Sequence, residues 1–293
     1  MRLFFVCTGN VCRSPMAEAL AQKHPGVEAR SGGVGAAFGA PMSEGARRAL
    51  AAAGLALPHH QSQEPSAEHL AWADWVLAMT QSHKEELVSR FPWARDWVLT
   101  LGEWAGSKED VEDPIGSTDQ VYAATMAHID RLIEKGLASQ GPGPRYGSAA
   151  GADHAGYLLK DRLLSQLPAP VLDVGTHDPS SVDYPIYAEA VAALVGQGRA
   201  GVGLLVCGTG IGMSIAANKL MGVRAAAVSD VSSAHLARAH NDANVICLGE
   251  RLIGPVVAED ALREFLATAF EGGRHSRRLE EIRALEDASG HGP

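Results

Sequence analysis

The N-terminal segment carries a cysteine and an arginine at a spacing suited to phosphoryl chemistry. Cys7 and Arg13 are separated by five residues in the run C-T-G-N-V-C-R-S, directly behind the apolar run Leu3–Val6. Pro15 suits the first position of a following helix, whose unpaired N–H groups favour an anion, including a thiolate. An arginine guanidinium can clamp two phosphoryl oxygens. We therefore expect a loop that binds a phosphoryl group and presents Cys7 as its nucleophile.

A nucleophilic cysteine needs a partner that protonates the leaving group, and Asp113 is the candidate. It precedes Pro114, which keeps it out of the helical region, so its carboxylate can project from a turn. An aspartate on a loop is a common solution for this proton transfer. With Cys7 and Arg13, Asp113 makes a set of groups for phosphoryl transfer.

A second cysteine, Cys207, opens a glycine-rich loop that runs to Ser214 behind the apolar run 202–206. The glycines let backbone N–H groups approach an oxyanion, and we expect a helix over 215–219 directly behind them. A loop of this kind also suits a dinucleotide. However, no acidic residue stands where a ribose hydroxyl needs one, and a nucleotide leaves the cysteine unexplained.

Short apolar runs alternate with helical patterns in both halves, which predicts parallel β-α-β units. The expected fold class is α/β, with two doubly wound parallel-sheet domains (flavodoxin-like or Rossmann-like) in tandem. Ligands bind at the carboxyl ends of such strands, and we expect Cys7, Asp153, Cys207 and the loop before Asn244 near these ends or on the approach to them. Strands are expected near residues 2–7, 27–31, 75–79, 97–101, 146–152, 170–174, 202–207, 223–228 and 244–248.

The boundary between the two domains is expected shortly after a long helix. Helical periodicity over 126–135 stops at Gly136, which predicts a C-cap there, and a glycine- and proline-rich stretch follows. We expect a first domain over 1–138, a short flexible linker over 139–145 and a second domain over 146–293.

Composition narrows the classes of function. The chain has 293 residues, of which 46% are hydrophobic and 20% charged, and its net charge is −9. Neither half has a basic excess, so we expect no nucleic-acid partner, and no polybasic or long apolar run favours a membrane. Four cysteines are too few for a disulfide scaffold, which favours a reducing cytoplasm.

Residues 1–138 resemble the low-molecular-weight protein-tyrosine-phosphatase family. The matching pieces are the loop 7–14, the run 30–33 (Arg-Ser-Gly-Gly), the run 76–80 and Asp113-Pro114. The resemblance implies a phosphocysteine intermediate on Cys7 that water hydrolyses, with Asp113 as acid and then base.

The same resemblance assigns supporting roles within the loop. It implies that Ser14 hydrogen-bonds the thiolate, and that Asn10 holds a left-handed kink supported by Ser31. The other residues expected to line the phosphoryl site are Thr8, Gly9, Val11 and Cys12.

Substrate choice within this family is left open by the sequence. Val11 stands where tyrosine phosphatases commonly have isoleucine or leucine and their arginine-phosphatase relatives have threonine. Ile115-Gly116 replaces the aromatic wall that stacks on phosphotyrosine, and the runs 5–10 and 76–82 look closer to the arginine branch. Phosphotyrosine is the preferred label and phosphoarginine its competitor, while arsenate reduction is disfavoured because further shuttle cysteines are missing.

Residues 146–288 resemble ribose-5-phosphate isomerase type B and its galactose-6-phosphate and allose-6-phosphate relatives. The resemblance rests on five further segments. These are 153–156 (Asp-His-Ala-Gly), 183–188, 240–245 (His-Asn-Asp-Ala-Asn-Val), 248–251 and 272–278.

The resemblance implies an aldose–ketose isomerisation through an enediolate, without a metal or other cofactor. His240 and Asp153 are carried over as ring-opening and hydroxyl-binding groups, Cys207 as the base that moves the proton, and Thr209 as its helper. Loop amides would stabilise the enediolate charge. The substrate-binding residues carried over are His154, Gly208, Gly210, Ile211, Gly212, Ser214, Asn241, Arg251, Arg274 and Arg278.

The sequence is therefore interpreted as a bifunctional cytoplasmic enzyme, a protein phosphatase joined to a pentose-phosphate isomerase. The expected partners are a phosphoprotein, a sugar phosphate and a second copy, because the family completes its isomerase site across a homodimer interface. Two alternatives stay open. The isomerase acts on a hexose 6-phosphate instead, or the phosphatase domain serves as a regulatory module.

Cys12 has two interpretations, and an oxidation experiment separates them. As a small buried apolar residue it needs no function, whereas as a trap it forms a reversible disulfide with oxidised Cys7. In the second case Cys12→Ala makes peroxide inactivation harder to reverse with added thiol. Recovery equal to that of the unaltered protein contradicts the trap.

Overall fold

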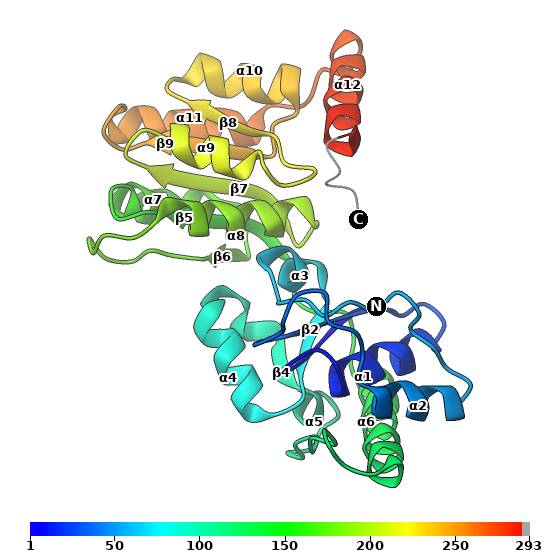
Figure 1. Cartoon of the computed structure of the whole chain (residues 1–293). Coiled ribbons are helices and arrows are strands. Elements are labelled where there is room, and N and C mark those ends of the chain that lie inside the picture. Colours follow the sequence, from blue (N-terminus) through cyan, green and yellow to red (C-terminus); the bar gives the residue numbers. More distant parts are fainter. Residues whose placement is uncertain (289–293) are drawn as a thin grey trace. The chain divides into compact units, whose positions relative to one another are not determined.

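The computed structural model describes residues 1–288, and its chain contacts divide it into two compact units, Met1–Pro144 and Arg145–Pro293. Each unit is a parallel-sheet α/β domain with its own core (Figure 1). Among the described residues, no helix is long and apolar enough to cross a membrane.

The first domain is built on a four-stranded parallel sheet in the order β2-β1-β3-β4. Its strands are β1 (Arg2–Cys7), β2 (Glu28–Gly33), β3 (Trp75–Ala78) and β4 (Val98–Thr100). β1 is central and covered on both faces, which is why its sequence is a continuous apolar run rather than an alternating one. Its carboxyl end delivers Cys7 to the edge of the sheet.

Alternate residues of β1 pack against two different helical layers. Leu3 and Phe5 belong to the core that includes residues of α1 (Arg13–Gln22) and α6 (Asp119–Ser139). Phe4 faces the other way and stacks on His69 of α3 (Ala67–Trp72) at a ring-centroid distance of 4.8 Å. Both phenylalanines are fully buried, which stabilises the fold by about 2–3 kcal/mol each. The remaining helices are α2 (Glu44–Ala52), α4 (Gln81–Arg90), a 3-10 turn (Pro92–Trp97) and α5 (Leu101–Trp104).

Two helix boundaries expected in this domain were wrong. Helix α1 begins at Arg13, two residues before Pro15. Proline is tolerated at this third position because N–H groups in the first turn of a helix have no partner within the helix, so a missing N–H costs no hydrogen bond. Helix α6 continues past Gly136 to Ser139. Gly136 is not a C-cap: a Cβ atom there would lie 1.9 Å from the Trp104 ring, so the glycine is needed for close packing.

The segment expected to be a flexible linker is attached to the first domain over part of its length. The indole N–H of Trp75 donates to the carbonyl of Gly141 at 2.8 Å, and the Gln140 side chain donates to the carbonyl of Trp104. Gly143 lies so close to Asp74 that a Cβ would meet its carbonyl oxygen. These contacts fix residues 140–143 on the first unit.

The second domain has a five-stranded parallel sheet in the order β6-β5-β7-β9-β8. Its strands are β5 (Tyr146–Ala152), β6 (Val171–Asp173), β7 (Ala200–Cys207), β8 (Ala225–Val228) and β9 (Val245–Gly249). Since β9 lies between β7 and β8, Cys207 at the end of β7 is paired with Gly249 at the end of β9.

Helices cover both faces of this sheet. One face packs against α7 (Tyr157–Leu163), α10 (Val231–Asn241) and α11 (Pro255–Ala267), while α8 (Tyr184–Gly196) covers β5 and β7 on the other. Gly203 of β7 leaves room for Val191 of α8, which a Cβ would meet at 2.8 Å. The other helical elements are α9 (Ile211–Ala217), α12 (Arg274–Ala288) and a 3-10 turn (Leu164–Gln166).

Gly136→Ala tests the packing of α6 because two effects predict opposite signs. Helix propensity alone stabilises an alanine by about 1 kcal/mol, whereas the clash with Trp104 destabilises by about 1–3 kcal/mol. We expect the clash to prevail, so that the free energy of unfolding falls. Denaturant unfolding followed by tryptophan fluorescence isolates this domain, since all five tryptophans lie in it. A more stable variant contradicts the packing.

Candidate functional sites

Cys7 lies at the carboxyl end of β1, at the bottom of a loop that leads into α1. Its Sγ atom is 3.1 Å from the hydroxyl oxygen of Ser14. The Ser14 hydroxyl in turn donates to the carbonyl of Gly32 at 3.1 Å. Since a thiolate can only accept, ionised Cys7 would draw the Ser14 proton from Gly32 to itself.

Asn10 determines the shape of this loop. Its backbone is left-handed (φ 54°), and its side-chain amide donates to the hydroxyls of Ser14 at 3.0 Å and Ser31 at 2.8 Å. The side-chain oxygen accepts the backbone N–H of Gln63, and the backbone carbonyl is 2.7 Å from Nε2 of His60. These contacts hold a conformation that a non-glycine residue adopts rarely.

The sequence reasoning missed the half-buried carboxyl group behind this network, that of Glu18. Ser31 donates to Glu18 of α1 at 2.6 Å, and burial raises the pKa of Glu18. The Ser31 proton is therefore committed to Glu18, which leaves Ser31 as the acceptor for Asn10. A polar residue on the inner face of a helix was the available signal.

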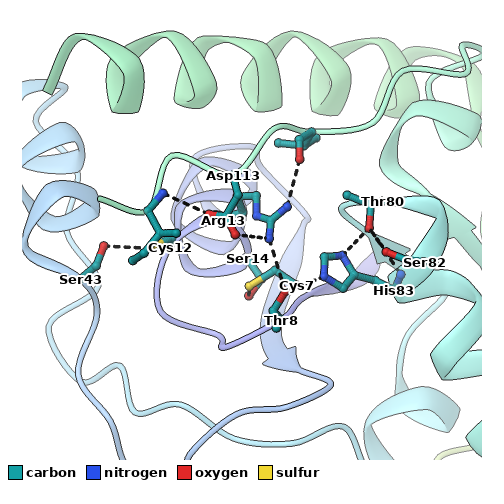
Figure 2. Close-up of polar contacts among 12 residues, drawn as sticks. Cys7, Thr8, Cys12, Arg13, Ser14, Ser43, Thr80, Ser82, His83 and Asp113 are labelled. Atoms are coloured by element: carbon teal, nitrogen blue, oxygen red, sulfur yellow. Dashed lines mark hydrogen bonds and ion pairs between the residues drawn. The ribbon is translucent and has the colours of Figure 1, made fainter. Parts of the chain in front are cut away.

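Arg13 and Asp113 form an ion pair at the mouth of the loop (Figure 2). One guanidinium nitrogen is 2.6 Å from a carboxylate oxygen of Asp113, and the other donates to the carbonyl of Val111 at 3.1 Å. Arg13 is 5% exposed and Asp113 is 40% exposed, so the pair is buried on the arginine side only. The structure thus brings together Cys7, Arg13 and Asp113 from segments a hundred residues apart.

His83 is a further polar residue at this site that the sequence reasoning missed. It is 7% exposed and lies in the first turn of α4, with one ring nitrogen 2.8 Å from the hydroxyl oxygen of Thr8. Figure 2 shows the imidazole beside Thr8, on the side of the loop that carries Arg13. The second ring nitrogen lies 2.8 Å from the hydroxyl oxygen of Thr80, which is 2.9 Å from that of Ser82.

Cys12 is a thiol that hydrogen-bonds away from the loop centre. Its Sγ donates to the hydroxyl of Ser43 at 3.0 Å and lies 3.7 Å from the Tyr122 hydroxyl. Burial raises the pKa of Cys12, which keeps it protonated. All four cysteines are free.

Two exposed apolar side chains, Ile115 and Phe38, lie in segments that contact the first site. Ile115 follows Asp113, whose carboxylate accepts the Ile115 N–H, and is 56% exposed. Phe38 is 88% exposed, in a loop whose Val34 N–H binds the carbonyl of Cys7. Phe38 was missed because an isolated aromatic in a glycine-rich stretch carries no pattern.

The loop after β7 has a tighter start than expected. Helix α9 begins at Ile211, four residues earlier than the predicted helix, and the left-handed Gly210 (φ 75°) is its N-cap. The N–H of Gly210 donates to the Sγ of Cys207 at 3.1 Å, and the hydroxyl of Thr209 accepts the N–H of Ile211. Gly212 packs on the Tyr184 ring, which a Cβ would meet at 2.9 Å.

Several other predicted residues lie at the same edge of the second sheet. Asp153 follows β5 and is buried, with its carboxylate accepting the N–H of Ala155. His154 accepts the N–H of Val182. The side chain of Arg251 lies over Gly208, where a Cβ would meet its aliphatic Cδ at 3.4 Å.

His240 lies at the opposite edge, so the expectation that the loop before Asn244 lies with Cys207 was wrong. His240 is in the last turn of α10, which leads into the amino end of β9, whereas Cys207 pairs with the carboxyl end of β9. The five residues of β9 separate the two groups by roughly 15 Å. Residues that precede a strand lie at its amino edge, and this signal was available in the sequence.

Around His240 the chain gathers a second cluster from the start of α12. Its ring stacks on His275 at a centroid distance of 4.3 Å and an interplanar angle of 8°. Glu271 lies 3.8 Å from Nε2 of both histidines, and Arg274 donates to His275. Burial, the neighbouring His240 and the positive charges of Arg274 and Arg278 lower the pKa of His275.

His240, Glu271 and His275 lie close enough together to hold a metal ion. Stacked rings, however, hold their in-plane nitrogen lone pairs in nearly parallel planes, so the lone pairs do not converge on one point. Arg274 also donates to a ring nitrogen that would have to bind the metal. The cluster is better suited to an anionic group than to a cation.

Comparison with known proteins gives the same division of the chain. A family model described as low molecular weight phosphotyrosine protein phosphatase matches residues 2–140, and one described as ribose/galactose isomerase matches residues 149–282.

Individual relatives match one half each. The ribose-5-phosphate isomerase B of Escherichia coli (strain K12) is 44% identical over 141 residues, which are 47% of this chain and 95% of that protein. The protein-arginine-phosphatase of Geobacillus stearothermophilus is 44% identical over 137 residues, 46% of this chain and 92% of that protein. A solved structure of Clostridium thermocellum ribose-5-phosphate isomerase B is 41% identical, with a TM-score of 0.47, over 48% of this chain and 98% of that one.

Proposed function

We propose that this chain is a bifunctional enzyme. It belongs to the low molecular weight phosphotyrosine protein phosphatase family over residues 2–140 and to the ribose/galactose isomerase family over residues 149–282. Both are families of enzymes. The first domain hydrolyses a phosphorylated protein side chain, and the second interconverts ribose 5-phosphate and ribulose 5-phosphate. Both reactions need a reduced cysteine, which suits a reducing compartment such as the cytoplasm.

The meeting of Cys7, Arg13 and Asp113 in one site carries the phosphatase proposal. The Cys7 thiolate attacks phosphorus, the bond to the leaving group breaks, and Asp113 gives that group a proton. Water then hydrolyses the phosphocysteine with Asp113 as base. A bound phosphoryl group draws the Arg13 guanidinium to its own oxygens, which releases the half-exposed Asp113 carboxyl for proton transfer.

Phosphoarginine is the first candidate substrate and phosphotyrosine the second. The relative named a protein-arginine-phosphatase is 44% identical over nearly its whole length, and Ile115 offers no aromatic surface beside the acid. Phosphotyrosine is favoured by the family description and by Phe38, an exposed ring that could stack on a phenol. Hydrolysis rates on matched phosphoarginine and phosphotyrosine peptides decide between them.

The geometry of Cys207 carries the isomerase proposal. Its buried thiol lies beside the loop amides that would stabilise an enediolate, and Asp153 and Thr209 lie on the same edge. Cys207 removes the proton from C2 of the open sugar and returns it to C1. His154, Arg251, Arg274 and Arg278 are proposed to hold the phosphate, with no cofactor involved.

A second copy of the chain is needed for this site to contain His240. Within one chain the residues of β9 separate His240 from Cys207. A two-fold dimer brings the His240 edge of one copy to the Cys207 edge of its partner and builds two equivalent sites. We therefore propose a homodimer through the isomerase domain, with ring opening by His240 and proton transfer by Cys207 from different copies.

Exchanging one cysteine at a time separates the two activities. Cys7→Ser removes the thiolate nucleophile and is expected to lower phosphopeptide hydrolysis by at least roughly a thousandfold while sparing isomerisation. Cys207→Ala is expected to do the reverse, and each variant is the control for the other. Loss of both activities from either change contradicts two independent sites.

Complementation between inactive variants tests the shared site. Cys207→Ala and His240→Asn are each expected to be inactive as isomerases, but a heterodimer of the two keeps one unaltered site. Random exchange of subunits then restores about a quarter of the original rate, measured with ribose 5-phosphate. Mixtures that stay inactive while subunit exchange is demonstrated rule out a site made from both copies.

A further inference from the structure

His83 is held by its own helix start. It lies in the first turn of α4, and its backbone N–H donates to the hydroxyl of the N-cap residue Thr80 at 3.4 Å. The preceding residue Met79 joins this turn to both loops of the phosphatase site. Its N–H donates to the carbonyl of Val6, and its carbonyl accepts the N–H of Val111, whose own carbonyl accepts from Arg13.

Both ring nitrogens of His83 have hydroxyl partners. Nδ1 is 2.8 Å from the hydroxyl oxygen of Thr80, and Nε2 is 2.8 Å from that of Thr8. Thr8 is also 3.5 Å from the guanidinium nitrogen of Arg13 that pairs with Asp113. Burial and the positive charge of Arg13 lower the pKa of His83, so the imidazole is neutral, with one N–H and one lone pair.

Either position of the ring proton leaves Thr8 bonded to the imidazole and leaves one of its lone pairs for Arg13. The hydroxyl of Thr8 is then fixed beside the guanidinium that clamps the phosphoryl group (Figure 2). Without the imidazole, the threonine side chain is free to rotate, because Thr8 is otherwise solvent-exposed.

We propose that His83 is a positioning residue of the phosphatase. It acts through the Thr8 hydroxyl, which holds the Arg13 guanidinium in the position where it binds the phosphoryl oxygens. The kinetic part of this inference rests on the proposed phosphatase function.

His69, a half-buried histidine of the same domain, caps a helix without contacting the phosphatase loop. His69 lies in the first turn of α3, where its Nδ1 bonds the N-cap residue Ser66. Burial lowers the pKa of His69 to about 4, and its ring stacks on Phe4 in the core. His69 therefore shares the capping contacts of His83, but its hydrogen bonds are to Ser66 and not to the phosphatase loop.

Two amide substitutions separate the contribution of the Nδ1 contact with Thr80 from that of the Nε2 contact with Thr8. The Asn side chain reaches about as far as Nδ1, so His83→Asn keeps the Thr80 contact and loses Thr8. The longer Gln side chain reaches about as far as Nε2, so His83→Gln keeps the Thr8 contact. We expect His83→Asn to lower kcat/KM for p-nitrophenyl phosphate and to weaken orthovanadate binding, each about tenfold, with His83→Gln much closer to the unaltered protein.

Further variants of the full chain provide the controls. In a Thr8→Val background the two His83 variants should be equal, because the group through which His83 acts is absent. His69→Asn should lower thermal stability but leave orthovanadate affinity unchanged, and the isomerase rate measures the amount of intact protein. Orthovanadate affinity is read by titration calorimetry.

If His83→Gln lowers kcat/KM and orthovanadate affinity while His83→Asn leaves both unchanged, the role of His83 is only to cap its helix. That result overturns the inference. Equal orthovanadate affinity in both variants and the unaltered protein overturns it as well. Absence of hydrolysis by the unaltered protein overturns the proposed function instead, and orthovanadate affinity then still decides the role of His83.

Discussion

In each domain all strands of the sheet run in one direction, and this constraint determines where chemistry can occur. Every strand-to-helix loop lies at the carboxyl edge, and every helix-to-strand loop lies at the amino edge. The first domain gathers Cys7, Arg13 and Asp113 at one edge. The second divides its groups, with Cys207 and Asp153 at the carboxyl edge and His240 and its arginines at the amino edge.

The two cysteine loops place different polar groups beside the thiol. Cys7 has a hydroxyl partner, Ser14, and a neighbouring cation that is paired with Asp113. Cys207 instead has a backbone N–H donor, that of Gly210. The first arrangement suits a dianion that replaces Asp113 on Arg13, whereas the second suits a small charge that develops on a sugar oxygen.

Local features of the sequence were enough to predict the strands and both cysteine loops. Parallel strands buried on both faces appear as apolar runs, and β1 and β7 are such runs. The errors have tertiary causes. Gly136 has the sequence pattern of a helix end, but a glycine is needed there because Trp104 packs on it. A contact between residues 32 positions apart leaves no local pattern in the sequence.

The polar residues behind the sites were missed for the same reason. His83 contacts Thr8 of the phosphatase loop, and Glu18 contacts Ser31, which supports that loop. Each is an ordinary helix residue when only its neighbours in sequence are considered. His240 was identified by its resemblance to a family motif, but its edge of the sheet was assigned wrongly. Its position directly before a strand predicts the amino edge of the sheet, which is where it lies.

Dependence of the isomerase on a second copy is the central claim, and dilution tests it within a single preparation. The specific isomerase and phosphatase rates are measured over a range of protein concentrations, with sedimentation giving the fraction of dimer. Isomerase rate per chain should fall with that fraction, while phosphatase rate per chain stays constant because its site lies within one domain. An isomerase rate per chain that persists where sedimentation finds only monomers contradicts the claim.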